Sequence, residues 1–231
     1  MTTTTNPLGV PAHRHANPDG TEGGWVANTA TVGPEVEVFG NAQVFDNAQV
    51  HDNAQVFDNA RIAGNARVYD NAQVFDNARI AGNARVFDNA RVFDNARVSG
   101  DAQVSGDAQV SGAALMYDNA QVSGDAQVYD NARIAGDALV SGDSVMSGAA
   151  LVSGDARVSE PQHVLTVGPI GSEDQHATLM PTPVGPRVVV GCWQGPLTEL
   201  LPEAQRRAPG HMDDYTALHA LFVSRAARWN R

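Results

Sequence analysis

The seven histidines and the single cysteine are the side chains of this sequence best suited to metal binding, base catalysis or nucleophilic attack. His13 and His15 are spaced like a metal-binding pair, but no third ligand stands nearby, so a solvated polar tail is the favoured interpretation. Cys192 could be a nucleophile with a histidine from the C-terminal region as its base. No oxyanion or base motif accompanies it, so we interpret Cys192 as a small hydrophobic residue buried at a strand end.

Other motifs of catalysis or cofactor binding are missing from the sequence. It contains neither a phosphate-binding loop nor a dinucleotide fingerprint. We therefore predict no catalytic residues, no metal ligands and no cofactor.

Composition and charge narrow the remaining classes of function. With 26 acidic and 15 basic residues, the formal net charge is -11, which argues against binding to nucleic acid or anionic membranes. A single cysteine excludes an internal disulfide framework and is typical of a reducing compartment. The N-terminus lacks the apolar stretch of an export signal, and no apolar run is long enough to span a bilayer. We therefore predict a cytoplasmic protein.

An uninterrupted repeat of six residues organises most of the chain. From Val26 to Val158, every sixth residue is aliphatic or Met, and the residue four positions later is almost always Ala. In Ala42-Gln43-Val44 the first and third residues would face inward and Gln43 outward, because alternate residues of a strand point to opposite faces. The intervening Asp-Asn and Gly-Asn pairs are typical of tight corners.

A longer repeat predicts three such turns per coil. Residues 53–70 and 71–88 are identical except for Tyr69 against Phe87. This identity indicates that coils stack on one another, with strands pairing at roughly 4.8 Å per coil. We predict an all-β solenoid of seven to eight coils, a triangular parallel β-helix whose aliphatic and Ala positions are buried and whose intervening residues are exposed.

The aliphatic anchor and the small residue four further on resemble the hexapeptide-repeat superfamily, the left-handed β-helices known from bacterial acyltransferases. The left hand is what this resemblance implies. Enzymes of that superfamily commonly bring a catalytic histidine and an interrupting loop to a cleft between trimer subunits. Here no loop interrupts the coils, and the only histidine within them is His51, at a corner beside Tyr69 and Phe87, where a surface or stacking role is favoured.

The repeat ends give the domain organisation. We predict an N-terminal tail or cap over residues 1–24 with Trp25 as its lid, the β-helix over 25–160, and an α+β module over 161–231. Strands are expected at 163–170, 177–180 and 187–192, followed by a helix from Glu199 capped by Thr198 and another from Asp213. The segments 168–172 and 191–197 resemble a C-terminal module of phage and prophage proteins that carry hexapeptide solenoids.

Threading the chain at 18 residues per coil places aromatic side chains in columns at two corners of its N-terminal half. Arginines form ladders on the faces between the corners. These side chains could stack and pair with corner Asp residues among themselves, or contact a partner. The candidate protein-interaction residues are Phe39, Phe57, Phe75, Phe93, Tyr69, Phe87, Arg61, Arg79 and Arg97.

Three hypotheses for function follow. The preferred one is a non-catalytic, phage-related interaction or structural protein in the host cytoplasm, a rigid rod for a protein partner or for its own copies in a homotrimer or dimer. The alternative is an acyltransferase-like enzyme with a trimer-cleft site and a histidine from the C-terminal module. An acidic DNA mimic is a minor alternative, because Asp columns repeat at roughly 4.8 Å while DNA phosphates repeat at about 3.4 Å along a strand.

Overall fold

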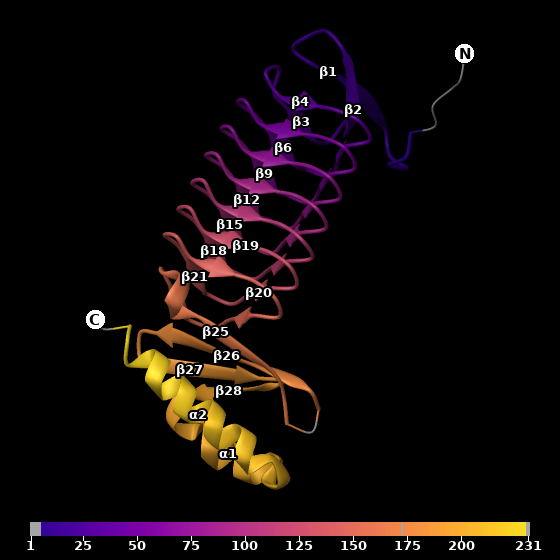
Figure 1. Cartoon of the computed structure of the whole chain (residues 1–231). Helices are drawn as coiled ribbons and strands as arrows, with labels where there is room; N and C mark the ends of the chain where they lie inside the picture. Colours follow the sequence, from indigo (N-terminus) through magenta and orange to yellow (C-terminus); the bar gives the residue numbers. More distant parts are fainter. Residues whose placement is uncertain (1–5, 172, 230–231) are drawn as a thin grey trace.

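The computed structural model describes residues 6–171 and 173–229, and the chain forms a three-sided parallel β-solenoid followed by a small antiparallel sheet and two helices (Figure 1). The predicted fold class is confirmed. Residues 1–5 of the predicted N-terminal segment, Ser172, and residues 230–231 of the C-terminal module lie outside the described residues. None of the described helices is long and apolar enough to cross a membrane.

Three parallel sheets, called faces 1 to 3, form the sides of the solenoid, and each strand inside a face pairs with the strands 18 residues before and after it. Face 1 comprises β2 (Glu22–Ala27), β5 (Gln43–Val44), β8 (Arg61–Ile62), β11 (Arg79–Ile80), β14 (Arg97–Val98), β17 (Leu115–Met116), β20 (Arg133–Ile134) and β23 (Leu151–Val152). Face 2 comprises β3 (Thr31–Val32), β6 (Gln49–Val50), β9 (Arg67–Val68), β12 (Arg85–Val86), β15 (Gln103–Val104), β18 (Gln121–Val122), β21 (Leu139–Val140) and β24 (Arg157–Val158). Face 3 comprises β4 (Glu37–Val38), β7 (Gln55–Val56), β10 (Gln73–Val74), β13 (Arg91–Val92), β16 (Gln109–Val110), β19 (Gln127–Val128) and β22 (Val145–Met146).

The core of the solenoid is the predicted double column of Ala and aliphatic side chains. From Val36 to Val158 these positions are buried in every coil, and Ser144, which replaces Ala, is buried too. The strand residues between them point outward, and they are exposed, as at Gln49 and Arg61, or half-buried, as at Gln55. The predicted register is therefore confirmed, since a shift by one residue would have exchanged these two sets.

The corners are closed by residues with left-handed backbone conformations. From Gly40 to Gly154 the second corner residue is Asp or Gly with a positive φ, for example 57° at Asp46 and 68° at Gly64. The left-handed conformation is unfavourable for Asp, and a hydrogen bond of its side chain offsets part of this cost. At Asp46, the Gly64 N–H of the next coil donates to Oδ2 at 2.9 Å. Coils are thus linked by corner side chains as well as by strand pairing.

The N-terminal cap is a hairpin in which β1 (Ala12–Ala16) pairs antiparallel with β2. His15 and Asn17 are buried beside β4, the first strand of face 3. His15 Nε2 donates to the Val36 carbonyl at 2.8 Å, and the Val38 N–H donates to Asn17 Oδ1 at 2.8 Å. The expectation of a solvated tail is therefore wrong for His15, because its ring replaces the coil that would otherwise pair with β4.

The C-terminal module forms a second cap. Its elements are η1 (Pro161–His163), β25 (Leu165–Ile170), β26 (Gln175–Thr182), β27 (Gly185–Val190), β28 (Trp193–Pro196), η2 (Leu197–Glu199), α1 (Leu200–Arg207), η3 (Pro209–His211) and α2 (Met212–Ala226). The three predicted strands and two helices are present with shifted bounds, and β28 was not predicted. Thr198 is not the predicted helix cap, because a 3-10 turn already begins at Leu197 and no side-chain cap bond forms.

The antiparallel sheet lies between the last coil and the helices (Figure 1). Met180 and Val189 join the core of the solenoid, whereas Leu179 and Val188 pack in the cluster formed with α1 and α2. The Leu151 N–H of the last coil donates to Thr178 Oγ1 at 3.2 Å. Both faces of the sheet are therefore covered, and the module closes the C-terminal end of the solenoid.

Candidate functional site

The first feature of the surface is a stack of phenylalanine rings at the corner between faces 3 and 1. The rings of Phe57 and Phe75 lie with centroids 5.4 Å apart, and those of Phe75 and Phe93 lie 4.9 Å apart. Phe39 occupies the same corner one coil before Phe57. Stacking of the aromatic residues on one another, one of the two possibilities that the sequence left open, is observed for these three rings.

A second stack follows the corner between faces 2 and 3. The ring of Tyr69 lies 5.2 Å from that of His51 and 5.0 Å from that of Phe87. His51 Nδ1 lies 2.7 Å from Asp52 Oδ2, and this hydrogen bond lowers the pKa of the Asp52 carboxyl. His51 thus takes part in stacking, as expected. Burial in the stack raises the pKa of the Tyr69 hydroxyl.

Face 3 lies between the two stacks, and its outward side chains form a polar centre. Gln73 Nε2 donates to Gln55 Oε1 at 3.0 Å, and Gln55 Nε2 donates to Glu37 Oε2 at 2.7 Å. The guanidinium of Arg91 lies over the ring of Phe75 at 5.3 Å and over that of Phe93 at 5.7 Å. We call this surface the aromatic-edged face, which comprises His51, Tyr69, Phe87, Phe57, Phe75, Phe93, Gln55, Gln73 and Arg91.

Arg91 was missed as a candidate residue. The 18-residue threading places it in the same row as Gln55 and Gln73, two positions before Phe93. It is the only basic residue of that row among the described residues. The sequence could have indicated Arg91, because it interrupts a row that otherwise consists mostly of glutamines. An arginine two residues before an aromatic residue at the next corner can place its guanidinium over that ring.

The arginine ladder that was predicted as part of the site lies on the neighbouring face. Arg61, Arg79 and Arg97 pair in register on face 1, across the corner that carries the phenylalanines. The guanidinium of Arg61 lies over Phe45, at the third corner, at 5.3 Å. The possibility that these arginines pair with corner Asp side chains is not realised within the described residues, whose ion pairs involve other arginines.

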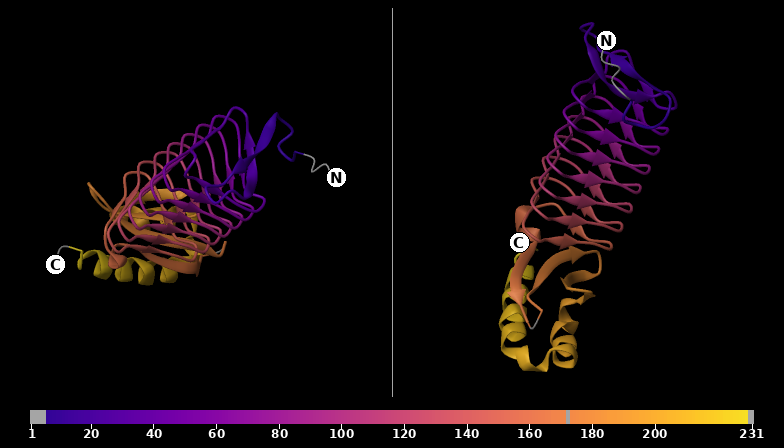
Figure 2. Two further views of the ribbon diagram at one scale, coloured as in Figure 1. Left: turned by 90° about the horizontal axis from the view of Figure 1, so that it is seen from above. Right: turned by 90° about the vertical axis from the view of Figure 1, so that its right-hand side faces the viewer.

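The rest of the chain leaves the aromatic-edged face uncovered as far as the structure describes it. Residues 6–27 remain at the first coils, and the C-terminal helices remain below the antiparallel sheet (Figure 2). The corner columns continue as Ser105 and Ser111 in the following coils, so the aromatic rings are concentrated in the N-terminal half.

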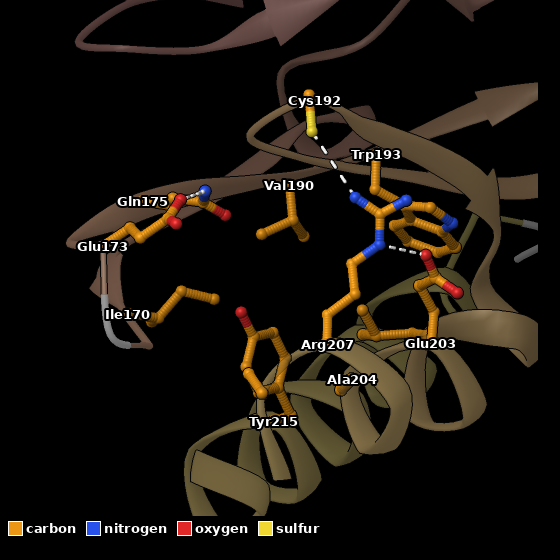
Figure 3. Close-up of a pocket in the computed structure, with 12 residues that line it drawn as sticks. Ile170, Glu173, Gln175, Val190, Cys192, Trp193, Glu203, Ala204, Arg207 and Tyr215 are labelled. Atoms are coloured by element: carbon orange, nitrogen blue, oxygen red, sulfur yellow. Dashed lines mark hydrogen bonds and ion pairs between the residues drawn. The ribbon is translucent and has the colours of Figure 1, made fainter. Parts of the chain in front are cut away.

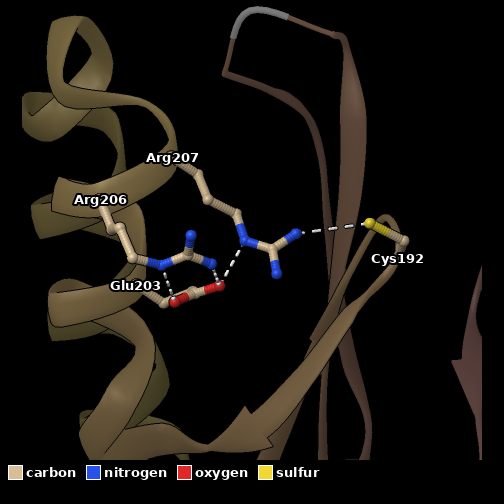
Figure 4. Close-up of polar contacts among 4 residues, drawn as sticks. All are labelled: Cys192, Glu203, Arg206 and Arg207. Atoms are coloured by element: carbon tan, nitrogen blue, oxygen red, sulfur yellow. Dashed lines mark hydrogen bonds and ion pairs between the residues drawn. The ribbon is translucent and has the colours of Figure 1, made fainter.

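Cys192 lies elsewhere, at the turn between β27 and β28, and it is exposed (Figure 3). Its interpretation as a buried hydrophobic residue is wrong, because β27 ends at Val190 and Gly191 turns the chain outward with a φ of 55°. Arg207 Nη1 lies 3.5 Å from Cys192 Sγ and the same guanidinium contacts Glu203 (Figure 4). Hydrogen bonding from Arg206 lowers the pKa of Glu203 to about 2.

A cavity of about 170 Å³ adjoins this cysteine. Its lining residues are Ile170, Glu173, Gln175, Val190, Cys192, Trp193, Leu200, Glu203, Ala204, Arg207, Ala208 and Tyr215. No histidine is among them, so the described residues do not pair the thiol with a histidine base in this cavity. Likewise, within residues 6–171 and 173–229 no three His, Cys, Asp or Glu side chains gather around a point where a metal ion could bind.

Comparison with known proteins supports the repeat architecture. The YdcK beta solenoid repeat matches residues 54–70, 72–86, 84–100, 90–106 and 126–142, all within the solenoid. These segments include most of the aromatic-edged face and none of the C-terminal module. No curated protein matches the chain.

Proposed function

We propose that this β-solenoid is a non-catalytic interaction protein that presents the aromatic-edged face to a protein partner or to further copies of itself. One observation carries the proposal, namely that aromatic stacks flank both edges of a single face, where the described chain leaves them accessible. Rigid aromatic side chains are enriched at protein interfaces because they contribute much contact area at little conformational cost.

The coil itself does not require these rings. The Phe87 N–H donates to the Val104 carbonyl at 3.0 Å, and Ser105, which follows Phe87 in the same column, donates to Val122 at the same distance. The buried Ala and aliphatic residues are also alike on both sides of this change. Since serine supports the same backbone pairing, the coil can form without the rings, and their accessible surface can serve a partner.

The side chains of the aromatic-edged face indicate which kind of partner surface would be complementary to it. Its two edges are apolar, and its centre offers amide groups and the guanidinium of Arg91. A flat protein surface with apolar residues at both sides and hydrogen-bond acceptors between them would be complementary. The arginine ladder of Arg61, Arg79 and Arg97 extends this contact around the corner. The resemblance of the C-terminal module to phage proteins supports a phage-related, cytoplasmic setting for the proposed function.

The proposal is tested with a triple substitution, Phe57→Ser, Phe75→Ser and Phe93→Ser. We expect the solenoid to remain folded by circular dichroism, whereas affinity for partners captured from the native host falls by about 30-fold or more, the loss typical of a 2 kcal/mol hot spot. The matched control is Tyr117→Ser, which removes an aromatic ring from the third corner and should leave binding unchanged. Unaltered partners for the triple variant would contradict the proposal.

Two further outcomes distinguish the alternative function and the self-association of the chain from binding to a foreign partner. Tight binding of an acyl-CoA to the solenoid, measured by calorimetry, would favour the acyltransferase-like enzyme. Loss of higher oligomers in the triple variant, with no change of other partners, would identify copies of the chain as the occupant of the face.

A further inference from the structure

Helix α2 has an apolar surface on its outer side as well as on its buried side. Tyr215, Leu218 and Phe222 pack in the core of the C-terminal module. From Thr216 to Ser224 the helix contains no Asp, Glu or Arg, although its outer residues face solvent. Leu221 is 47% exposed. Val223 is 46% exposed, so the outer side of the helix combines two exposed apolar side chains with small and polar ones. Large apolar residues left exposed on a helix that already has a buried face offer a contact to a second partner.

The outer residues form one continuous stripe. Asp213, Ala217, Ala220, Leu221, Ser224 and Arg228 follow one another at intervals of one, three and four residues, and all six are exposed. Each residue rotates the helix by about 100°, so steps of three or four residues return nearly to the same side. The six residues therefore fall within an arc of about 100° around the helix. Arg228 follows the end of α2, where its N–H donates to the Arg225 carbonyl at 3.0 Å and continues the helical path.

This stripe is matched with itself when the helix is reversed. A two-fold axis between Ala220 and Leu221 exchanges Ala217 with Ser224 and Asp213 with Arg228. We propose that two copies of the chain form a dimer by antiparallel pairing of α2 through this stripe. Each end of the pair then places an aspartate against an arginine, and the centre contains Leu221 between small residues.

Charge and side-chain size both support the antiparallel arrangement. A parallel pair would place Asp213 against its own copy and Arg228 against its own copy, which is unfavourable. Ala217, Ala220 and Ser224 are small enough for the helix axes to approach to about 8 Å. The contact is short, since a helix of 15 residues is about 22 Å long. We therefore expect a weak, reversible dimer, as is usual for small interfaces.

The dimer would join two solenoids at their C-terminal ends. α2 lies at the opposite end of the molecule from the first coils (Figure 1), so both aromatic-edged faces stay accessible. Two binding faces on one particle would increase avidity for a repetitive partner. The pairing itself does not depend on the proposed function.

Sedimentation velocity of the full chain at about 100 µM tests the proposal. We expect a concentration-dependent dimer for the wild type and a weakening of at least 10-fold for Ala220→Glu, which places two carboxylates beside the axis. The matched control is Val223→Glu on the same helix, where the residue is 46% exposed but lies outside the stripe. A wild-type monomer, or equal loss of dimer in both variants, would overturn the proposal.

A charge exchange tests the direction of pairing. Asp213→Arg and Arg228→Asp should each weaken the dimer, whereas the double variant should regain most of it. A double variant no better than either single one would refute the antiparallel arrangement, provided circular dichroism shows an intact helix. The phenylalanine triple variant should keep the dimer mass, and Ala220→Glu should keep the affinity of a single chain for its partner, so each proposal can fail without the other.

Discussion

The rings of Phe75 and Phe93 lie 3° from parallel with centroids 4.9 Å apart, although they belong to successive coils. The separation is the same as the spacing of paired strands, about 4.7 to 4.9 Å. Strand pairing therefore holds identical corner residues at the distance at which aromatic rings stack, and the stack adopts the rigidity of the solenoid. The phenylalanine corner is preorganised for contact, since little side-chain freedom remains to be lost on binding.

The position within the stack should determine what each ring contributes to stability. Phe75 stacks on two neighbours and Phe93 on one. Because each stacked pair contributes about 0.5 to 1.5 kcal/mol, we expect Phe75→Ser to lower the free energy of unfolding by about 1 kcal/mol more than Phe93→Ser. Urea unfolding measures both variants. Equal losses would mean that the rings act by burial alone.

The N-terminal cap should depend on two buried polar side chains. His15→Ala leaves the Val36 carbonyl without its donor, and Asn17→Ala leaves the Val38 N–H without its acceptor. A buried polar group without a partner costs about 1 to 3 kcal/mol. We expect faster amide exchange in β4 for each variant, whereas His13→Ala, at an exposed position of the same hairpin, should have no such effect. Unchanged exchange in β4 would contradict the capping mechanism.

The Asn ladders along the corners have a direction, which substitutions can test. Asn65 Nδ2 donates to Asn83 Oδ1 at 3.1 Å, and Asn83 Nδ2 donates to Asp101 Oδ1 at 2.9 Å. The last residue only accepts, so aspartate suits that position. Asn65→Asp should lower the free energy of unfolding by about 1 kcal/mol because a donor is lost, while Asp101→Asn should change it little. Thermal unfolding that ranks the two variants in the opposite order would disprove this.

Tyr69 offers a spectroscopic probe of the aromatic-edged face. Its pKa is raised above the ordinary value because burial disfavours the phenolate. The corresponding stability is present below the unfolded pKa and is lost as pH rises through the folded pKa. Phe87→Ser should expose the ring and shift the Tyr69 titration, followed by NMR, to lower pH. A bound partner should shift the Tyr69 titration to higher pH. If the partner leaves the titration unchanged, it contacts the protein at another surface.

The sequence by itself determined the solenoid and the register of every coil. In a stack where each coil contacts only its neighbours, a constant interval along the chain becomes a constant position in space. The 18-residue repeat therefore predicted that Phe57, Phe75 and Phe93 share a corner and that Gln55 and Gln73 share a face. The residues of the aromatic stacks could be predicted for the same reason.

Only the tertiary structure decided the parts that do not repeat. His15 and Asn17 become caps because the hairpin folds back over β4, and Cys192 is exposed because the chain turns at Gly191. Leu221 remains exposed because the sheet covers only the opposite side of α2. No interval in the sequence relates these residues to their neighbours. Their positions depend on contacts between segments that are distant in the chain. Each of these contacts occurs only once, so no periodic pattern in the sequence predicts it.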